Sequence, residues 1–248
     1  MPNYRELNCE NCNEEFKVLV KRKNARFCSK GCATSNRQRL SDPNFMSEEN
    51  ELKYYILGLI LTDGCVSQQE SKMKRMTFRT SDIQLAEMLH PIISPDRKMY
   101  ANKPYKVEHN ISYALINTNP ELLDILDSYG ITPRKSYDVK FPDIPEDFIT
   151  HFIRGVFDGD GSISKMNISK YKYKRISITS ASFYFISELL KILLRYSFPV
   201  KVIKDNRKDA YYLTMHNQKE IERFGEWIYK DCNYCMERKR QRFNGDIV

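Results

Sequence analysis

The sequence predicts an α+β protein in which a small metal-binding module precedes two similar halves. Three observations support this prediction. A nearly apolar segment that ends in Asp-Gly occurs twice, at residues 54–66 and 152–163; a strand of alternating polar and apolar residues follows each copy; and four cysteines cluster near the N-terminus. A chain of 248 residues is long enough for this plan. We expect a module with its linker at 1–46 and two halves at 47–144 and 145–248.

The four N-terminal cysteines predict a structural zinc site. Their pattern is C-x2-C followed by C-x3-C, which in a reducing compartment indicates zinc rather than disulfides. Four thiolates would hold zinc tetrahedrally and supply the folding energy that so short a segment lacks. The expected ligands are Cys9, Cys12, Cys28 and Cys32.

Basic residues surround these cysteines, and a polar segment follows them. The basic residues either contact DNA or form the solvated face of a folded cap; they are Lys17, Lys21, Arg22, Lys23 and Arg26. Residues 33–50 are polar, with a turn signal at Asp42-Pro43-Asn44, and are expected to form the linker. Ser47 is the expected N-cap of the next helix.

The two apolar segments predict two buried helices that pack on each other. Each carries a glycine inside an apolar run, and a helix that is apolar all round must be buried. Small residues form a stripe on each helix, which would let the two backbones approach closely; these stripes are Gly58, Thr62 and Cys65 in one and Gly155, Gly159 and Ser162 in the other. Such packing would place Asp63 and Asp160 side by side at the C-terminal ends.

Two carboxylates at adjacent helix ends predict a divalent-cation site. Helix C-termini carry partial negative charge, so the two acids repel each other unless a cation lies between them. Carboxylate and carbonyl oxygens suit Mg²⁺, which can activate water for phosphodiester hydrolysis. The alternative is that Asp63 and Asp160 merely end two buried helices.

Each half is predicted to have the element order α-β-β-α-β-β-α. The strand at 74–81 matches the one at 174–181, about 100 residues later, and both alternate with period two. Helices are expected at 83–93, 120–129, 183–194 and 219–229, and further strands at 112–117 and 211–216.

One face of these strands is polar and cationic in both halves, and it is the expected DNA-binding surface. A twisted antiparallel sheet can follow the major groove of DNA. The alternative is ordinary protection of sheet edges by lysine. The candidate DNA contacts are Lys72, Lys74, Arg75, Thr77, Arg79, Lys165, Lys172, Arg175, Ser177, Arg207 and Lys208.

The nine-residue segments 56–64 (ILGLILTDG) and 153–161 (IRGVFDGDG) resemble the two motifs of double-motif LAGLIDADG homing endonucleases, and the resemblance covers roughly residues 50–248. It implies two pseudo-symmetric subdomains that form a β-saddle over double-stranded DNA, with Asp63 and Asp160 as the Mg²⁺-binding acids.

The sixth motif position differs between the copies, with Leu61 in the first and Asp158 in the second. Arg154 stands at a usually small position and is expected to loosen the helix contact. The cysteine module resembles small treble-clef-like zinc fingers of mobile-element nucleases.

The same resemblance implies a lysine near each acid, which would stabilise charge on the phosphate. The candidates are Lys135 and Lys239, with Lys140 as an alternative; basic turns that only touch phosphate are the other interpretation.

Cys232 and Cys235 form another C-x2-C pair. We favour packing of these cysteines beside a terminal helix over their forming half of a metal site.

The composition agrees with a polyanionic partner. The net charge is +8 and the sequence pI is about 9.0. Neither a membrane span nor a signal peptide is recognised, so an intracellular, cytoplasmic protein is expected, encoded by a prokaryote or phage, with an organelle as the alternative. We expect a monomeric, intron-encoded or free-standing endonuclease that cuts both DNA strands at a long site. The alternative function is a non-cleaving nucleic-acid binder on the same fold, such as an intron maturase or a DNA-binding regulator.

Overall fold

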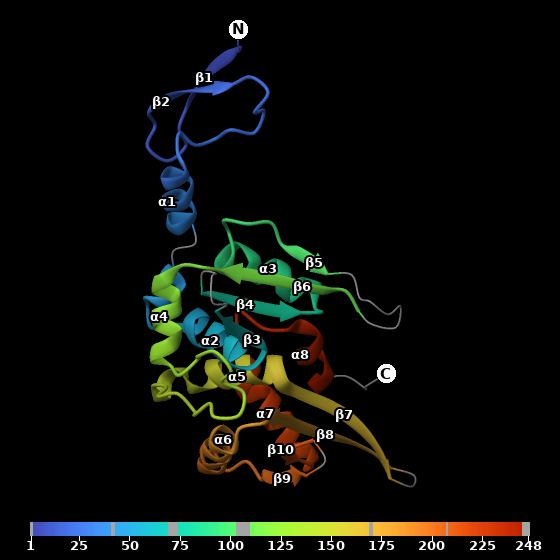
Figure 1. Ribbon diagram of the computed structural model, residues 1–248. Coiled ribbons are helices and arrows are strands. Elements are labelled where there is room, and N and C mark those ends of the chain that lie inside the picture. Colours follow the sequence, from blue (N-terminus) through green and yellow to red (C-terminus); the bar gives the residue numbers. More distant parts are fainter. Residues whose placement is uncertain are drawn as a thin grey trace.

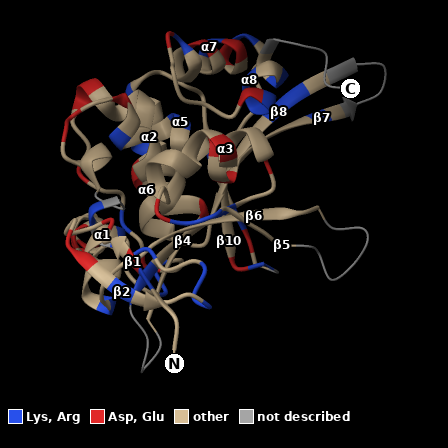
Figure 2. Cartoon of the chain, turned by 90° about the horizontal axis from the view of Figure 1, so that it is seen from above, with Lys and Arg blue, Asp and Glu red and all other residues tan. Residues whose placement is uncertain are grey.

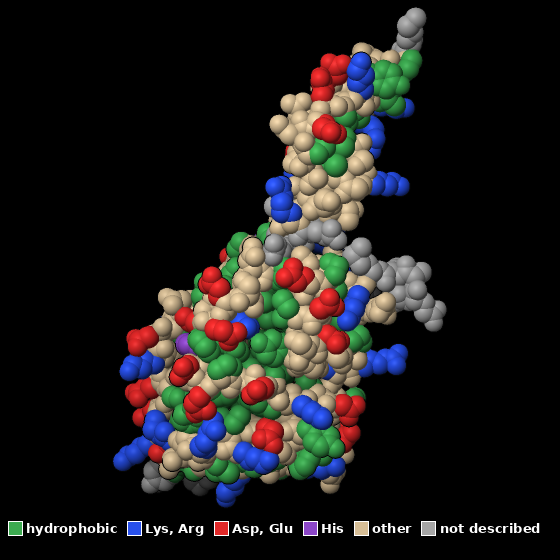
Figure 3. Space-filling view, turned by 90° about the vertical axis from the view of Figure 1, so that its left-hand side faces the viewer, with side chains coloured by type: hydrophobic (Ala, Val, Ile, Leu, Met, Phe, Trp, Pro, Cys, Tyr) green, Lys and Arg blue, Asp and Glu red, His purple; other side chains and the backbone are tan. Residues whose placement is uncertain are grey.

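The N-terminal module is a β-hairpin followed by a helix (Figure 1). The computed structural model describes residues 2–40, 43–68, 74–102, 110–168, 171–206 and 208–244. Strands β1 (Tyr4–Asn8) and β2 (Glu15–Leu19) pair antiparallel, and α1 (Lys30–Leu40) follows. The module extends away from the body of the molecule, as Figures 1 and 3 show.

Helix α1 occupies the first part of the predicted linker, residues 33–50. The Ser29 hydroxyl accepts a hydrogen bond from the Cys32 amide at 3.1 Å, which starts the helix two residues after the third cysteine. The prediction that Ser47 caps the next helix was wrong. Asn50 caps it instead, because its side chain accepts from the Lys53 amide at 3.0 Å.

The two halves repeat one element order, as predicted. A short 3-10 turn, η1 (Asn44–Met46), precedes the first half. The first half consists of α2 (Glu51–Asp63), β3 (Gly64–Ser67), β4 (Arg75–Thr80), α3 (Ile83–Ile93), β5 (Tyr100–Asn102), β6 (Ser112–Asn117) and α4 (Pro120–Ser128). The turn η2 (Glu146–Phe148) leads into the second half. That half consists of α5 (Ile149–Asp160), β7 (Gly161–Ile168), β8 (Tyr171–Ser180), α6 (Phe183–Arg195), β9 (Lys201–Asp205), β10 (Ala210–Met215) and α7 (Gln218–Tyr229). One further helix, α8 (Glu237–Asn244), follows α7.

Both sheets have the same antiparallel strand order. The first runs β3-β4-β6-β5 and the second β7-β8-β10-β9. In β4, Met76 and Phe78 are buried, whereas Arg75 and Arg79 are exposed, so the predicted alternation is confirmed. Ile176 and Ile178 repeat the buried pattern in β8. Helices cover the apolar face of each sheet and leave the polar face open.

Helices α2 and α5 pack directly on each other at the centre of the molecule, between the two sheets (Figure 1). Two glycines make this contact possible. A Cβ added to Gly58 would lie 2.8 Å from the Val156 nitrogen, and one added to Gly155 would overlap the Tyr55 carbonyl oxygen. No side chain fits between the backbones at these positions, which confirms the function predicted for the two glycines. Cys65 and Ser162, however, lie in strands β3 and β7, so they are not part of the helical stripes.

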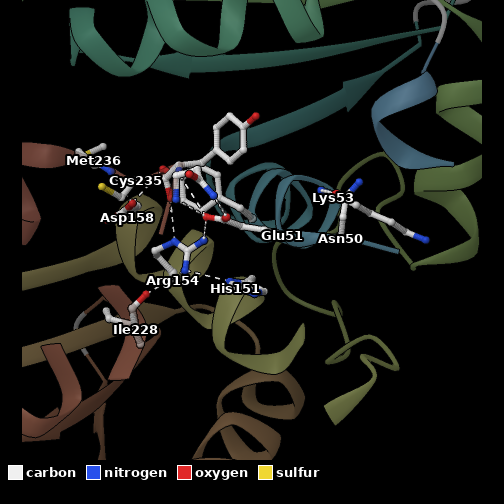
Figure 4. Close-up of polar contacts among 12 residues, drawn as sticks. Asn50, Glu51, Lys53, His151, Arg154, Asp158, Ile228, Cys235 and Met236 are labelled. Atoms are coloured by element: carbon white, nitrogen blue, oxygen red, sulfur yellow. Dashed lines mark hydrogen bonds and ion pairs between the residues drawn. The ribbon is translucent and has the colours of Figure 1, made fainter. Parts of the chain in front are cut away.

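Arg154 tightens this core, contrary to the expectation that it would loosen the helix contact (Figure 4). Its side chain is completely buried and donates to Glu51 Oε1 at 2.6 Å, on the other motif helix. It also donates to the carbonyl oxygens of Ile228 at 3.0 Å and Tyr234 at 2.8 Å. A buried guanidinium is stable only when its donors are paired in this way. Arg154 therefore joins α5 to α2 and to the segment between α7 and α8.

Replacement of Arg154 by methionine is expected to lower the free energy of unfolding by about 3 kcal/mol. The change leaves the Ile228 and Tyr234 carbonyl oxygens and the Glu51 carboxylate short of a partner. Urea denaturation followed by circular dichroism would measure it. Arg195→Met is the control, since Arg195 forms an exposed ion pair with Glu146, and should change stability by about 0.5 kcal/mol at most. Equal effects of the two changes would contradict this role of Arg154.

Asp158, at the sixth position of the second motif, is a second buried junction. Its carboxylate accepts from the hydroxyls of Tyr55 at 2.9 Å and Tyr229 at 2.5 Å, and from the Met236 amide at 2.6 Å. Burial raises the pKa of Asp158 to about 6, although these hydrogen bonds oppose the rise. The carboxylate therefore ties α5 to α2, α7 and the start of α8 and is not available to a ligand.

Among the described helices, none combines the length and the hydrophobicity that a membrane-crossing segment requires.

Candidate metal and nucleic-acid site

Asp63 and Asp160 are the last residues of α2 and α5, and a strand begins at the glycine that follows each of them. An added Cβ on Gly64 or Gly161 would overlap a residue of the preceding helix, so only glycine allows this direct turn from helix to strand. Because α2 and α5 pack against each other, both acids lie at the same end of the central helix pair. Both side chains remain in contact with solvent.

The charges of the two acids interact. Desolvation by the surrounding protein and, second, the negative charge of Asp63 raise the pKa of Asp160 to about 6. Desolvation also raises the pKa of Asp63, while Lys239 and Lys135 oppose the rise. The residues before the two acids are also in contact, since a Cβ added to Gly159 would overlap the Thr62 hydroxyl, and the two acids are therefore neighbours, as predicted. A divalent cation between them would remove the cost of holding two carboxylates there, and the available oxygen donors suit a hard cation such as Mg²⁺.

Both candidate lysines lie near the acids. The positive charge of Lys135 acts on both carboxylates, and Lys135 lines a cavity of about 80 Å³ with Asp160 and Thr62. Desolvation lowers the pKa of Lys135 and lowers that of Lys239 to about 8. Lys140 is exposed and does not line this cavity.

The polar face of the second sheet forms a groove of about 830 Å³. Arg175 and Ser177 of β8 line it, as predicted, but Ser177 is nearly buried and its hydroxyl is 2.9 Å from that of Ser162. The Arg175 side chain lines the groove, and its Nε atom is buried without a hydrogen-bond partner among the described residues. Figure 2 shows the basic residues on β8 and on the N-terminal module.

Sequence reasoning missed several residues of this groove. Tyr212 and Thr214 of β10 face it opposite Thr179 and Ser177, and β9 contributes Ile203 and Asp205. The signal was available, because Leu213 and Met215 are apolar and adjacent residues in a strand face opposite sides.

The remaining DNA-contact candidates are distributed unevenly. On β4, Arg75 and Arg79 are exposed, whereas Thr77, on the same face, is only 5% exposed. Lys74 stands two residues before Met76, so its side chain lies on the same face of the sheet, towards the helices. There its ammonium pairs with Asp127 at 3.8 Å. Lys165 is directly opposite Lys174 and likewise continues the apolar face of its sheet.

The placement of Lys74 and Lys165 corrects their assignment to the polar face. Lys208 is exposed in the turn between β9 and β10. Lys72, Arg207 and the side chain of Lys172 lie outside the described residues.

The four N-terminal cysteines converge as predicted. The sulfur atoms of Cys9, Cys12, Cys28 and Cys32 all lie within 4.8 Å of one another. The Cys12–Cys28 and Cys28–Cys32 sulfur distances are 3.7 and 3.4 Å. Tetrahedral zinc, with bonds of about 2.3 Å, would hold its sulfurs roughly 3.8 Å apart, so this donor set fits zinc. Cys232 and Cys235 lie between α7 and α8, partly buried against the core, which agrees with the packing interpretation.

Comparisons with known proteins agree with this architecture. A family model described as a LAGLIDADG-like domain matches residues 147–229. Two curated relatives are a probable translation initiation factor IF-2 of Methanocaldococcus jannaschii and elongation factor 2 of Methanopyrus kandleri. The chain is 27% identical to the first over 207 residues, which are 79% of this chain and 16% of the relative. It is 28% identical to the second over 180 residues, which are 71% of this chain and 13% of the relative. The chain therefore spans less than a fifth of the length of these relatives.

Solved structures of DNA-bound meganucleases are similar in fold. I-SmaMI bound to uncleavable DNA superposes with a TM-score of 0.53 at 15% identity, covering 80% of this chain and 87% of that chain. I-AabMI bound to uncleaved DNA gives a TM-score of 0.52 at 12% identity, covering 79% and 89%. Residues 147–229 thus match the LAGLIDADG-like family model, and about four fifths of the chain share the fold of these meganucleases.

Proposed function

We propose that this chain is a divalent-metal-dependent endonuclease that hydrolyses both strands of double-stranded DNA at a long, specific site. The observation that carries the proposal is the meeting of Asp63 and Asp160 at the ends of two helices whose backbones are in contact. An open polar groove on the second sheet and DNA-bound relatives of the same fold support it.

The residues of this chain have separate tasks in the proposed reaction. Asp63 and Asp160 would hold Mg²⁺, which when bound supplies Lewis-acid activation of water and stabilises the leaving oxygen. Water is the nucleophile, and a lysine ammonium beside the scissile phosphate offsets the developing negative charge. The polar strand faces would position the duplex, with Arg75 and Arg79 in one half and Arg175 in the other as base or phosphate contacts. One chain supplies both acids, so it would act as a monomer.

The test is cleavage of a duplex selected by the protein from a randomised DNA library. With Mg²⁺, the proposal expects two cuts, one in each strand, that leave short 3′ overhangs. With Ca²⁺, which occupies carboxylate sites but supports hydrolysis poorly, it expects binding alone. Specific binding with no cleavage in Mg²⁺ or Mn²⁺ would overturn the endonuclease and leave a DNA-binding protein.

The N-terminal module would extend the basic surface. Its residues 16–40 include no acidic side chain, and Arg22, Arg26 and Lys30 line a hollow of about 360 Å³ beside the cysteine cluster. We infer that zinc holds this segment folded and that the segment contacts DNA phosphates beyond the two sheets.

Replacement of Cys28 by serine is expected to remove zinc and flatten the salt dependence of DNA binding. If two or three phosphate contacts are lost, the slope of log K against log salt should fall by roughly 2–3. Mass spectrometry of the intact protein and binding titrations at several salt concentrations would measure the two effects. Cys232→Ser, outside the cluster, should change neither zinc content nor slope. A zinc-free variant with the parental slope would contradict the phosphate contacts.

A further inference from the structure

Lys239 occupies an unusual position for a lysine that is expected to act on DNA. It lies on α8, is only 7% exposed, and its ammonium contacts four backbone carbonyl oxygens. The partners are Phe157 at 2.9 Å, Asp158 at 2.7 Å, Gly159 at 3.0 Å and Gly161 at 2.6 Å. An ammonium has three hydrogens, so these oxygens use all of its donors. Three of the carbonyls belong to the last turn of α5, where the carbonyl oxygens carry the negative end of the helix dipole, and the fourth belongs to Gly161 at the start of β7.

The helix that carries Lys239 is itself fixed to both halves. The Met236 amide, just before α8, donates to Asp158 at 2.6 Å, and Arg154 holds the Tyr234 carbonyl of the same segment. Arg238, the neighbour of Lys239, pairs with Asp82 of the first half at 2.8 Å. Movement of Lys239 towards a substrate would therefore break contacts on both sides of the molecule.

Lys135 differs from Lys239 in each of these respects. It lies in the segment after α4, is half-buried, and its ammonium makes no hydrogen bond with the described part of the chain. Its charge nonetheless acts on both Asp63 and Asp160, and it faces the small cavity that Asp160 also lines. Its donors remain available for a phosphate oxygen or a water molecule there.

We propose that the two lysines have different tasks: Lys239 is a positioning residue that closes the carbonyl end of α5 and fixes Asp160, and Lys135 is the lysine that contacts the reacting phosphate. The inference rests on the proposed endonuclease activity. The pseudo-symmetric pair is thus functionally unequal, although the sequence places one lysine at an equivalent position in each half.

Two matched variants, Lys135→Met and Lys239→Met, separate the tasks. Methionine keeps an unbranched side chain and removes the charge. Without DNA or metal, Lys239→Met should lower the melting temperature by about 5 °C or more, because four carbonyl oxygens lose their contact with the ammonium. Lys135→Met should shift it by about 2 °C at most. With DNA and Mg²⁺, Lys135→Met should slow single-turnover cleavage about 100-fold or more at unchanged DNA affinity. The loss in Lys239→Met should be smaller and should diminish at low temperature, where the helix end stays ordered.

Two results would overturn the proposal: an unchanged melting temperature in Lys239→Met, or equal, temperature-independent cleavage losses in both variants. If the parental protein cuts no duplex, the endonuclease proposal fails, and the melting temperatures still decide the positioning role of Lys239.

Amine labelling of the parental protein keeps the proposal testable should Lys239→Met not fold. Acetylation followed by mass spectrometry should modify Lys135 about 10-fold faster or more than Lys239, with exposed Lys140 as the reference. Labelling of Lys239 at the rate of Lys140 would show that its ammonium is not held by α5.

Discussion

Replacement of Asp160 by asparagine is expected to slow DNA cleavage roughly 10³-fold while DNA affinity changes less than about threefold. The amide keeps the size of the side chain but removes one of the two charges that would hold Mg²⁺ at the helix ends. Single-turnover cleavage and a binding titration in Ca²⁺ on the same duplex would measure the two quantities. Asp63→Asn should produce a similar loss, because the two acids share one site.

The matched control is Asp147→Asn. Asp147 is exposed at the opposite end of α5, so its replacement should leave both cleavage and binding unchanged. If Asp160→Asn loses affinity as much as it loses cleavage, Asp160 supports the fold or the DNA contact and does not hold the metal.

Asp160→Asn is also expected to change how the stability of the protein depends on pH. The pKa of Asp160 is raised from 3.8 to about 6, so the folded state binds this proton more tightly than the unfolded state does. The resulting stabilisation is present below about pH 4 and is lost as the pH rises through 6. The metal-free parental protein should therefore be less stable relative to Asp160→Asn at pH 7 than at pH 4. Melting temperatures of both proteins at the two pH values measure this, and added Mg²⁺ should reduce the difference at pH 7.

Replacement of Gly155 by valine is expected to lower the free energy of unfolding by about 4 kcal/mol or more. A Cβ at this position would overlap the Tyr55 carbonyl oxygen and lie 3.0 Å from the Leu59 nitrogen. Backbone atoms cannot rotate aside as side chains do, so α2 and α5 must separate. Separation of the helices would also move Asp63 away from Asp160, and cleavage should fall together with stability.

Gly31→Ala is the control for the glycine prediction. Gly31 lies in α1, where an added Cβ would meet only the Ser29 hydroxyl at 3.6 Å, an ordinary contact. Alanine favours helices more than glycine does, so this change should be neutral or slightly stabilising. Urea denaturation of both variants measures the difference. A Gly155→Val protein of parental stability would mean that the backbones of α2 and α5 are not in contact.

The core of the fold was predictable because its signals are local. The glycines and apolar residues of α2 and α5 stand within single helices, and the alternation in β4 and β8 spans a few residues. The error in Lys74 was avoidable, since a lysine two residues before Met76 must share its face of the strand. The same parity rule applied to β10 would have identified Tyr212 and Thr214 as groove residues.

The buried polar residues were not predictable, because their partners lie far along the chain. Arg154 pairs with Glu51 on the other motif helix and with carbonyls of Ile228 and Tyr234, and no sequence pattern connects these positions. Lys239 was recognised as a lysine equivalent to Lys135, but its burial depends on how α8 packs against the end of α5 and the start of β7. The contact of the Asp158 carboxylate with the Met236 amide likewise joins residues that are 78 positions apart.

The central claim is that Asp63 and Asp160 jointly bind a divalent cation at the ends of α2 and α5. Anomalous diffraction from crystals of the protein with its DNA duplex and Mn²⁺ tests it most directly. We expect a manganese peak about 2.0–2.3 Å from a carboxylate oxygen of each aspartate, with DNA phosphate oxygens completing its coordination. Bound, ordered DNA with manganese elsewhere, or with carboxylates that contact only water and lysine, would contradict the claim.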